Sequence, residues 1–525
     1  MWLPYSRRPP KGQEYAAFGR ASGRAPARAR CKTPRVSRFT FDNTYARLPA
    51  RFYARVRPTP VREPRLVQVN HTLARDLGVD PDWLASDEGV GILAGNSIPD
   101  GAEPLAMAYA GHQFGSFVPE LGDGRAILLG ETLSQRGARV DVQLKGSGRT
   151  PFSRRGDGRA ALGPVLREYV VAEAMAALGV PTTRALAAVT TGELVVRETR
   201  LPGAVLTRVA ASHLRVGTFQ FFAARNDHEA VAELTRYALA RHFPPAPAEN
   251  QASELLDRVI TAQAKLVASW LSVGFIHGVM NTDNTAISGE TLDFGPCAFL
   301  DEFDPRKVFS SIDHGGRYAF ANQPRIAHWN LTRLAEALLP QLGDDEPTAV
   351  RIAGDVLDRF PDRFRSEYDS LMRAKLGLRD EEAEDAALVE DLLHRLAADR
   401  VDYTLFFRAL CAAAIDESRD QEVAALFADR QGFHDWAAGW RLRLRRSGCD
   451  PEDAARAMRL ANPAIIPRNH RIEQAISAAT ELGDFEPFEL LVRALEHPYD
   501  DQPQFADLTA PPLPNELVTR TFCGT

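Results

Sequence analysis

The sequence predicts a two-lobe α+β fold in which a strand-rich first part is followed by a helical second part. Three observations lead to this prediction. The chain has 525 residues, which is too many for one small hydrophobic core. Short apolar runs separated by glycines fill residues 39–209, a pattern typical of strands. From about Asp227 onward the apolar residues recur at helical spacing, and this order of elements indicates an α+β arrangement.

The first part contains five segments that predict strands and one that predicts a helix. The helix covers Leu162–Leu178, where apolar residues follow helical spacing and the sequence Gly-Val-Pro ends the pattern. The strands are short apolar runs bounded by glycines and polar residues. They are Arg125–Thr132, Val140–Lys145, Ala185–Val189, Leu194–Val196 and Ala204–Val209.

The second part is expected to be helical because its apolar positions repeat every three to four residues. The clearest predicted helices are Ala252–Val273, Asn330–Leu342, Glu381–Leu396, Ala454–Leu460 and Ile472–Leu482. The predicted division is therefore an N-lobe over residues 39–209 and a C-lobe over residues 210–525.

Residues 1–38 differ from the rest of the chain in composition. They hold ten basic residues and one acidic residue, with prolines and small residues between them. This composition predicts a disordered extension. An Arg-rich, acid-poor segment is also typical of a mitochondrial transit peptide, so a mitochondrial location is the alternative to a cytoplasmic one.

Composition and charge exclude several classes of protein. A formal net charge of −6 argues against a general nucleic-acid binder, which needs a surplus of basic residues. The longest weakly polar stretch, residues 266–282, is too short and too mixed for a membrane span. The five cysteines form no CxxC pair, so neither a zinc site nor a disulfide framework is expected. We therefore expect neither nucleic acid nor a membrane among the partners.

A first glycine-rich run, Gly111–Arg125, has the composition of a phosphate-binding loop. It contains Gly122 and Gly124 and leads directly into the predicted strand at Ala126. Glycines let backbone N–H groups approach phosphates, and Arg125 adds a positive charge. An ordinary turn before a strand is the alternative for this run.

A second glycine-rich loop, residues 146–159, holds four arginines and four glycines. Guanidinium groups bind phosphate through two parallel hydrogen bonds, so this loop is a candidate polyphosphate-binding loop, with a solvated basic loop as the alternative.

Lys145 precedes the loop, and Glu168 lies on the helix that follows it. A strand lysine and a helix glutamate can pair and hold the ammonium against nucleotide phosphates. Because only six of the 63 basic residues are lysines, a lysine in a strand suggests a specific role.

The most informative motif begins at His277. His277 and Asn284 have the spacing of the protein-kinase catalytic loop, and Asp293-Phe-Gly follows nine residues after Asn284. Asn and Asp supply the oxygen ligands that Mg²⁺ prefers. Val279 occupies the position of the kinase catalytic aspartate, and valine accepts no proton. The chain is therefore either inactive or uses Asp283 for a different reaction.

Taken together, these blocks resemble the SelO family of protein adenylyltransferases, also called YdiU. The resemblance runs from about Phe41 to the C-terminal segment around Cys523, and it is closest over residues 111–168 and 277–305. It implies a bilobal, protein-kinase-like fold in which ATP is bound flipped relative to a kinase. The α-phosphate would then face the acceptor, so that AMP moves to a Ser, Thr or Tyr hydroxyl of a protein substrate and pyrophosphate leaves.

The resemblance also implies roles for individual residues. Asp283 is implied as the proton acceptor, and Asn284 and Asp293 as ligands of Mg²⁺, with Mn²⁺ as a substitute. Glu168 is implied as the partner of Lys145. Contacts with ATP are implied for Gly122, Gly124, Arg125, Lys145, Asp157, Gly158, Arg208, Arg215 and Asp293.

General chemistry supports two of these roles. Pyrophosphate gains charge as it leaves, and Lys145, Arg208 and Arg215 would supply a cationic clamp for it. An Mg²⁺ ion next to Asp283 would lower the pKa of its carboxyl group and keep it ionised at neutral pH.

Two questions remain open at this level. An atypical phosphotransferase is one alternative to AMP transfer, and a non-catalytic nucleotide-binding pseudokinase, suggested by Val279, is another. The family resemblance also suggests redox control through Cys523, with Cys297 as its candidate partner. A buried Cys297 and an exposed free Cys523 are the alternative.

Replacing Val279 by aspartate tests the expected orientation of ATP. If the α-phosphate faces the acceptor, Val279→Asp restores the kinase aspartate without creating a kinase. Incubation with ATP labelled at the γ-phosphate should therefore leave the acceptor protein unlabelled. γ-Label on protein in this variant would contradict the flipped orientation, and AMP transfer with it.

Overall fold

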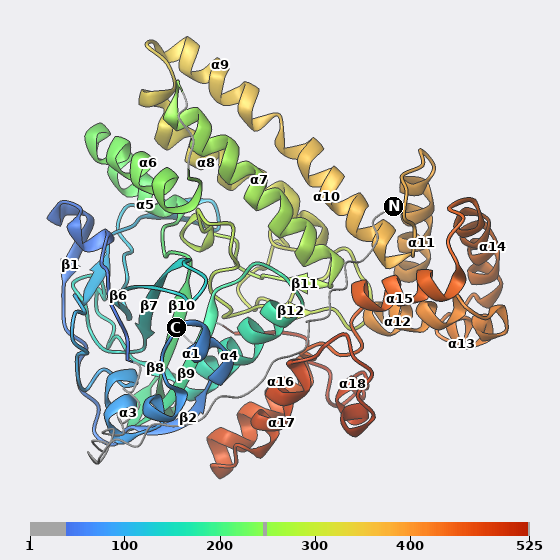
Figure 1. The fold of residues 1–525 in the computed structure, drawn as a ribbon, viewed down its shortest axis with the longest axis horizontal. Coiled ribbons are helices and arrows are strands. Elements are labelled where there is room, and N and C mark those ends of the chain that lie inside the picture. The colour runs from blue at the N-terminus through green and yellow to red at the C-terminus, as the bar shows by residue number, and fades with distance from the viewer. Residues whose placement is uncertain (1–37, 245–248, 523–525) are drawn as a thin grey trace, which may run out of the picture. The chain divides into compact units, whose positions relative to one another are not determined.

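The computed structural model describes residues 38–244 and 249–522. The chain is mixed α/β: the strands of one large sheet lie between Tyr53 and Ala210, and helices dominate after that point (Figure 1). The expected order of a strand-rich part and a helical part is confirmed. The lobe boundary after residue 209 stays a prediction. The predicted extension over residues 1–38 lies outside the described residues except for Arg38.

One antiparallel sheet forms the framework of the first part. Its strands follow the order β1-β3-β6-β7-β10-β9-β2, and β8 pairs with β10 outside this path. The strands are β1 Tyr53–Arg55, β2 Arg65–Val69, β3 Leu105–Met107, β6 Ala126–Leu133, β7 Arg139–Lys145, β8 Ala160–Ala161, β9 Arg184–Val196 and β10 Arg200–Ala210.

Three of the predicted strands are confirmed as β6, β7 and β10. The prediction of separate strands over Ala185–Val189 and Leu194–Val196 is wrong, because both segments belong to the single strand β9. Gly192 has a positive φ of 68°, yet it does not end the strand. Pairing with β10 continues past it through a register shift at Gly203, where a bulge absorbs the irregular geometry.

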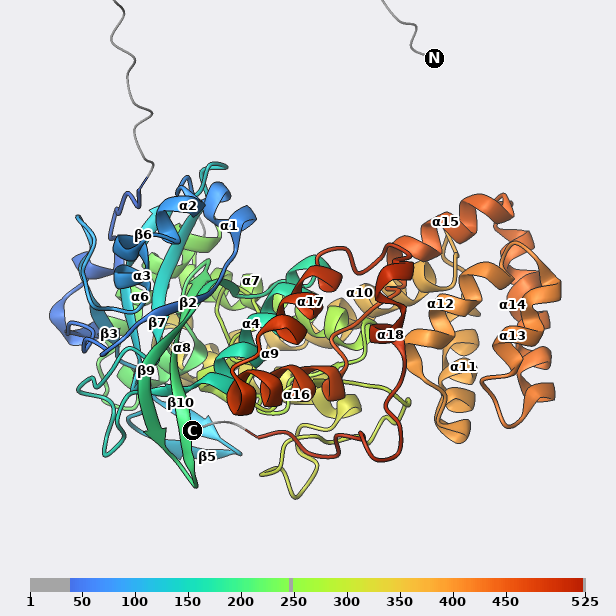
Figure 2. The same ribbon diagram turned by 90° about the horizontal axis from the view of Figure 1, so that it is seen from below.

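Side chains alternate along β7, which gives the sheet an apolar face and a polar face. Val142 and Leu144 enter a hydrophobic cluster with three short helices, whereas Gln143 and Lys145 point to the opposite face. Helix α4 packs on that opposite face, between the sheet and the helices of the second part (Figure 2). The helices of the first part are α1 His71–Asp76, α2 Pro81–Leu84, α3 Asp87–Leu93 and α4 Leu162–Ala177.

The second part is a helical assembly in which α7 packs against both α8 and α10 (Figure 1). One hydrophobic cluster joins α4, α7 and α8, and a second one fills the space among α10 to α15. The helices are α5 Val216–Ala223, α6 His228–His242, α7 Gln251–Ser272, α8 Gln323–Leu342, α9 Glu346–Leu357, α10 Phe360–Lys375, α11 Asp385–Asp399, α12 Tyr403–Ala413, α13 Asp420–Ala424, α14 Arg430–Arg446, α15 Pro451–Ala461, α16 Asn469–Ser477, α17 Glu486–Leu495 and α18 Ala506–Thr509.

Helix α8 begins earlier than the sequence predicts. The prediction placed its start at Asn330, and the structure starts it at Gln323. Pro324 lies in the first turn, where a missing backbone N–H removes no intrahelical hydrogen bond, so the proline initiates the helix. The other predicted helices correspond to α7, α11, α15 and α16, with a π-helical turn over Ala478–Leu482 extending the last of them.

Two small hairpins bring loops toward the polar face of the sheet. Strand β11 (Phe275–Ile276) pairs with β12 (Ala298–Phe299), and the chain between them carries a 3₁₀ helix over Thr282–Asn284. The second hairpin consists of β4 (Gly111–Gln113) and β5 (Ser116–Val118), within the first glycine-rich run. The connection between β11 and β12 therefore holds the predicted residues Asp283, Asn284 and Asp293, whereas the β4–β5 hairpin comes before Gly122, Gly124 and Arg125 in the first glycine-rich run.

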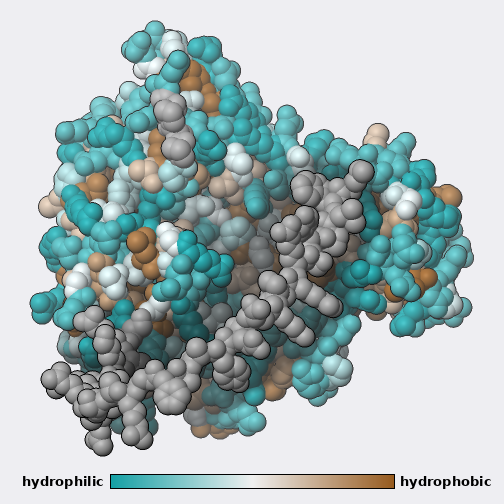
Figure 3. All heavy atoms as spheres, viewed as in Figure 1, coloured by the Kyte–Doolittle hydropathy of each residue, from teal (hydrophilic) through white to brown (hydrophobic). Residues whose placement is uncertain are grey.

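The described residues include no helix that is long and apolar enough to cross a membrane. The face seen in Figure 3 is mainly hydrophilic, with hydrophobic residues in small separate patches.

Lys375, the last residue of α10, is a buried lysine outside the predicted site. Its side chain lies in the second cluster, with Nζ 4.1 Å from the centre of the Phe407 ring and 5.2 Å from that of Tyr403. Burial lowers the pKa of Lys375 to about 7. An unfolded lysine has a pKa of about 10.4. Between these values the unfolded chain binds one more proton than the folded chain, so this lysine makes the protein more stable as the pH rises.

We predict that Lys375→Met stabilises the protein at pH 7 and that this gain shrinks as the pH rises toward 10. Methionine fills the same space without a charge, so the variant lacks the proton-linked slope of about 1.4 kcal/mol per pH unit. Urea unfolding at several pH values measures the difference in unfolding free energy. Lys265→Met, on the exposed side of α7, is the matched control. A gain that is constant or grows with pH would contradict a neutral buried lysine.

Candidate active site

A cavity of about 760 Å³ opens between the polar face of the sheet, the two glycine-rich loops and the 3₁₀ helix Thr282–Asn284. Every residue for which the sequence predicts a contact with nucleotide, proton or metal lines this one cavity. They are Gly122, Gly124, Arg125, Lys145, Asp157, Gly158, Arg208, Arg215, Asp283, Asn284 and Asp293. The remaining predicted residue, Glu168, lies behind the wall, where it binds Lys145.

Glu168 on α4 holds two cations of the cavity wall. Lys145 Nζ lies 2.5 Å from Glu168 Oε2, and Arg208 Nε donates to Glu168 Oε1 at 2.9 Å. The strand register explains why both cations point the same way, since Leu206 pairs with Lys145 and Arg208 pairs with Gln143 on neighbouring strands. All three charged side chains are buried. The predicted Lys145–Glu168 pair is therefore present, and the partnership of Arg208 with Glu168 is a feature that the sequence did not indicate.

Asp293 adds a second carboxylate to this cluster. Lys145 Nζ donates to its Oδ1 at 3.2 Å. Burial alone would raise the pKa of Asp293, but Lys145 and Arg208 outweigh it and hold the pKa well below its usual range. The backbone of Asp293 has a φ of 73°, in the left-handed region that aspartate tolerates better than most residues. A strained backbone at a cavity wall is typical of a functional position.

Asp283 lies in the same cavity but has a different environment. Gln113 donates to its Oδ2 at 3.3 Å, while its buried Oδ1 has no hydrogen-bond partner among the described residues. Gly111 makes room for it, because a Cβ at that position would lie 2.5 Å from Asp283 Oδ1. Burial raises the pKa of Asp283 to about 6. Desolvation outweighs the hydrogen bond from Gln113 and the charge of Arg215, which both lower the pKa. The lowering expected from a bound Mg²⁺ stays a prediction.

Asn284 and His277 have separate tasks in the loop. Asn284 Nδ2 donates to the backbone oxygen of Val279 at 3.1 Å, which fixes the orientation of the amide. His277 is fully enclosed, and its Nε2 lies 3.1 Å from the backbone oxygen of Leu292, just before Asp293. The histidine therefore ties the two ends of the motif together at the wall of the cavity.

Arg215 is positioned from three sides. Its Nη1 donates to the backbone oxygen of Asp283 at 3.2 Å, and its guanidinium lies 4.1 Å from the centre of the Tyr109 ring. Its Nη2 is 3.7 Å from Oδ1 of the buried Asp123. Sequence analysis missed Tyr109, Asp123 and Gln113. Gln113 and Asp123 lie inside the glycine-rich run Gly111–Arg125, and Tyr109 lies just before it. This position was the one sequence feature that could have indicated a role for them.

The two glycine-rich loops contact each other at the mouth of the cavity. A Cβ at Gly122, where φ is 63°, would lie 2.2 Å from Phe152 Cγ. A Cβ at Gly158, where φ is 70°, would lie 2.1 Å from the backbone oxygen of Gly148. These glycines are therefore required for loop packing as well as for access to the backbone. At the rim, Asp157 Oδ2 accepts from Arg197 Nη1 at 2.9 Å.

Cys297 is buried next to the site. Its Sγ donates to the backbone oxygen of Phe294 at 3.2 Å, and burial raises its thiol pKa to about 12. Thr521 Oγ1 donates to the backbone oxygen of Pro296 at 2.6 Å, so the end of the described chain lies beside this residue. Cys523 is outside the described residues, and its pairing with Cys297 stays a prediction.

The donor set of the cavity fits a hard cation only together with a ligand. Among the described residues, no cluster of three His, Cys, Asp or Glu side chains has the geometry of a metal site. A metal here would have to combine the amide oxygen of Asn284 and the carboxylate of Asp293 with oxygens that the protein does not supply. Mg²⁺ commonly binds in this way, through one or two side chains and the phosphates of a substrate.

Comparison with known proteins identifies relatives over almost the whole chain. A family model described as protein adenylyltransferase SelO matches residues 35–496. The chain is 60% identical over 491 residues to protein nucleotidyltransferase YdiU of Rhodopseudomonas palustris strain BisB5, covering 93% of this chain and 99% of that protein. Proteins with the same name from a Bradyrhizobium species and from Methylorubrum extorquens are each 60% identical, with the same coverage.

We predict that Glu168→Gln destabilises the ligand-free protein by about 3–5 kcal/mol, because it leaves two buried cations without full compensation. The measurement is the unfolding free energy from denaturant titration. The control is Asp355→Asn, which breaks an exposed pair with Arg351 whose side chains are 65% and 61% exposed for Arg351 and Asp355. That change should cost at most about 1 kcal/mol. Equal effects of the two substitutions would show that Glu168 does not hold the cluster together.

Proposed function

The chain belongs to the SelO family of protein adenylyltransferases, and we propose that it moves AMP from ATP to Ser, Thr or Tyr hydroxyls of protein substrates. Membership of the family makes the chain a nucleotidyltransferase, and the proposal concerns the nucleotide, the acceptor and the residues that act. The observation that carries it is the single cavity in which Lys145, Arg208 and Arg215 face the carboxylates of Asp283 and Asp293. The cations of this cavity would bind a polyphosphate, and its two carboxylates would accept a proton and bind a metal ion.

We further propose that the strand-rich and helical parts are the two lobes of a protein-kinase-like fold. The pair between Lys145 on β7 and Glu168 on α4 supports this proposal, because kinases pair a strand lysine with a helix glutamate. The loop between β11 and β12 supports it as well, since it carries His277 and Asn284 at the kinase spacing, followed by Asp293-Phe-Gly. Val279 at the aspartate position separates the chain from ordinary kinases.

In the proposed reaction, the oxygen of an acceptor hydroxyl bonds to the α-phosphorus of ATP, and the bond from that phosphorus to the β-phosphate oxygen breaks. Pyrophosphate leaves with increased negative charge, so fixed cations on its side of the cavity lower the barrier. Lys145, Arg208 and Arg215 are already held in place by Glu168, Asp123 and the backbone of Asp283. Because these groups do not reorganise during the reaction, their stabilisation is available when the charge develops.

Asp283 is the proposed acceptor of the hydroxyl proton. Its Oδ2 accepts one hydrogen bond from Gln113 and its Oδ1 accepts none among the described residues, so the carboxylate keeps acceptor capacity for the substrate hydroxyl. A general base has to lie within hydrogen-bonding distance of the proton that it removes. Capping of the loop through a backbone hydrogen bond is the alternative role for Asp283. Its side chain accepts a hydrogen bond from the side chain of Gln113, which lies outside this loop, and this favours the catalytic role.

Asn284 and Asp293 are the proposed ligands of Mg²⁺, for which Mn²⁺ is a substitute. When bound, the ion would neutralise phosphate charge and withdraw electron density from the reacting phosphorus. Asn284 is oriented by its hydrogen bond to Val279, and Asp293 is kept ionised by Lys145 and Arg208. Both side chains are thus prepared for a cation, and the other carboxylate, that of Asp283, is left for the proton.

Separate labelling of ATP at the α- and γ-phosphates tests the proposed function. The purified chain is incubated with candidate acceptor proteins and Mg²⁺, with a second reaction containing excess chelator. We expect α-label on protein, no γ-label on protein, and loss of transfer when the metal is removed. γ-Label would instead indicate a phosphotransferase, and the absence of both labels would indicate a nucleotide-binding pseudokinase.

We predict that Asp283→Asn lowers the rate of AMP transfer by about a hundredfold or more and leaves ATP affinity nearly unchanged. Asparagine has a similar shape but takes no proton. The matched variant Asp157→Asn removes a carboxylate at the rim, where it should raise the KM for ATP rather than lower kcat. Steady-state kinetics and direct ATP binding separate the two effects. Near-normal turnover of Asp283→Asn at saturating ATP would exclude Asp283 as the base.

A further inference from the structure

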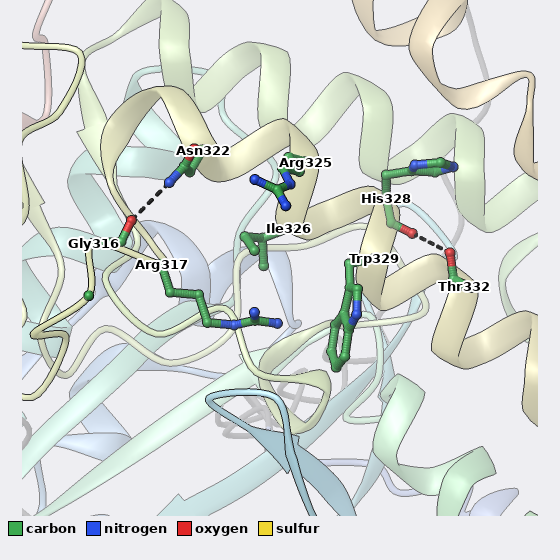
Figure 4. Close-up of a pocket in the computed structure, with 9 residues that line it drawn as sticks. Gly316, Arg317, Asn322, Arg325, Ile326, His328, Trp329 and Thr332 are labelled. Atoms are coloured by element: carbon green, nitrogen blue, oxygen red, sulfur yellow. Dashed lines mark hydrogen bonds between the residues drawn. The ribbon is translucent and has the colours of Figure 1, made fainter.

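A second cavity, of about 550 Å³, lies where helix α8 begins (Figure 4). Its walls come from the loop before α8 and from the first three turns of the helix. The side chains of Arg317 and Arg325 point toward the same space, and Trp329 closes it from another side (Figure 4). The lining residues are Gly315, Gly316, Arg317, Asn322, Arg325, Ile326, His328, Trp329 and Thr332.

This cavity is positively charged, because two arginines and no acid line it. Within the described part of the chain, neither Arg317 nor Arg325 forms an ion pair, and the buried Nε of Arg317 has no hydrogen-bond partner. Asp313, the acid nearest to Arg317 in sequence, uses its two oxygens to accept the backbone N–H groups of Arg317 and Tyr318. The cationic charge of the cavity is therefore not neutralised by its own walls.

Trp329 lies beside two guanidinium groups and holds them near the cavity. Its ring lies 4.7 Å from the guanidinium of Arg317 and 4.9 Å from that of Arg333. His112 packs edge-on against the same ring at 5.3 Å. Stacking on an indole holds a guanidinium in one plane at little further entropic cost, so that its N–H groups can bind a planar, two-oxygen anion.

The hairpin β4–β5 connects the two cavities. Gln113 donates to Asp283 in the candidate active site, and two residues later Gly115 lies against Arg317, whose Cζ would be 3.7 Å from a Cβ at that glycine. Tyr318, next to Arg317, donates to Asn281, two residues before Asp283. Extended chain advances about 3.3 Å per residue. A segment that reaches Asp283 thus needs only a few more residues to reach Arg317.

We propose that the second cavity binds an Asp or Glu side chain of the acceptor protein, a few residues from the hydroxyl that is modified. This inference rests on the proposed function, in which a protein segment enters the site beside Asp283. A carboxylate matches the unpaired guanidiniums of Arg317 and Arg325 in charge and in planar geometry. The cavity therefore selects acceptor segments with an acidic residue at a set distance from the reacting hydroxyl.

The first test measures binding directly and does not depend on catalysis. The probes are fluorescent ten-residue peptides that contain one serine and either four Glu, four Gln or four Lys residues. They are titrated with the full-length chain at fixed ionic strength, and fluorescence anisotropy reports the affinity. The proposal expects the Glu peptide to bind about tenfold more tightly than the Gln peptide, and the Lys peptide to bind least. Equal binding of the Glu and Gln peptides would overturn it.

Charge reversal then locates the binding. Arg325→Glu should weaken binding of the Glu peptide about tenfold and improve binding of the Lys peptide, whereas Arg325→Lys should keep the preference for Glu. Arg325 is exposed and forms no ion pair within the described residues, so the fold should tolerate both changes. The matched control is Arg430→Glu, at the exposed start of α14. An unchanged preference in Arg325→Glu, or an equal change in Arg430→Glu, would overturn the proposal.

A small anion is the other source of negative charge, and inorganic phosphate is titrated against the bound Glu peptide. Displacement only at concentrations that act through general screening supports a carboxylate of the acceptor. Displacement at micromolar phosphate would mean that the cavity binds a free anion, and the proposal would be wrong.

Transfer from α-labelled ATP to the same peptides separates this proposal from the proposed function. If label reaches the serine equally in all peptides and in Arg325→Glu, AMP transfer stands and the acidic preference is refuted. If the Glu peptide binds through Arg325 but neither peptides nor proteins are labelled, the carboxylate site stands and AMP transfer fails. Labelling of the Glu peptide that falls about tenfold in Arg325→Glu, with ATP affinity unchanged, supports both.

Discussion

The site depends on one cluster of four charged side chains, in which the buried Lys145, Arg208 and Glu168 meet the half-buried Asp293. Two positive and two negative groups balance each other, and each comes from a different element of the fold. A single uncompensated charge in such a place costs several kcal/mol, so no member of the cluster is stable there without the others. The packing of α4 against the sheet and the position of the loop before β12 are therefore coupled through electrostatics as well as through the hydrophobic core.

The same balance prepares the cavity for a ligand that carries charge. Phosphates can share the cations that Glu168 already orients, and a divalent ion can share the carboxylate of Asp293. The charged groups of the cluster are thus fixed in position before a ligand binds. Preorganised electrostatic stabilisation requires such fixed groups. Asp283 is outside this balance. Its carboxylate is buried beside a glutamine and the edge of a hairpin, and burial keeps its pKa at about 6.

The hairpin β4–β5 has a larger role than its six strand residues suggest. Gly111 allows the close approach of Asp283, Gln113 holds the carboxylate, and Gly115 lies against Arg317 of the second cavity. One short element therefore positions the group that meets the acceptor hydroxyl and borders the place where we propose that the rest of the acceptor binds. Gly111 is explained by its close contact with Asp283, and Gly115 by its positive φ of 86° in the turn.

The sequence by itself determined what is local: the alternation that turns Lys145 away from the apolar face, the helical spacing of α4 and α7, and the spacing of Asn284 and Asp293. It did not reveal that Ala185–Val189 and Leu194–Val196 are one strand, because only pairing with β10 carries the chain past Gly192. Only the tertiary structure decided that Arg208 shares Glu168 with Lys145 and that Gln113 holds Asp283. These contacts join residues 40 and 170 positions apart, and strand register and burial, which no local pattern contains, bring them together.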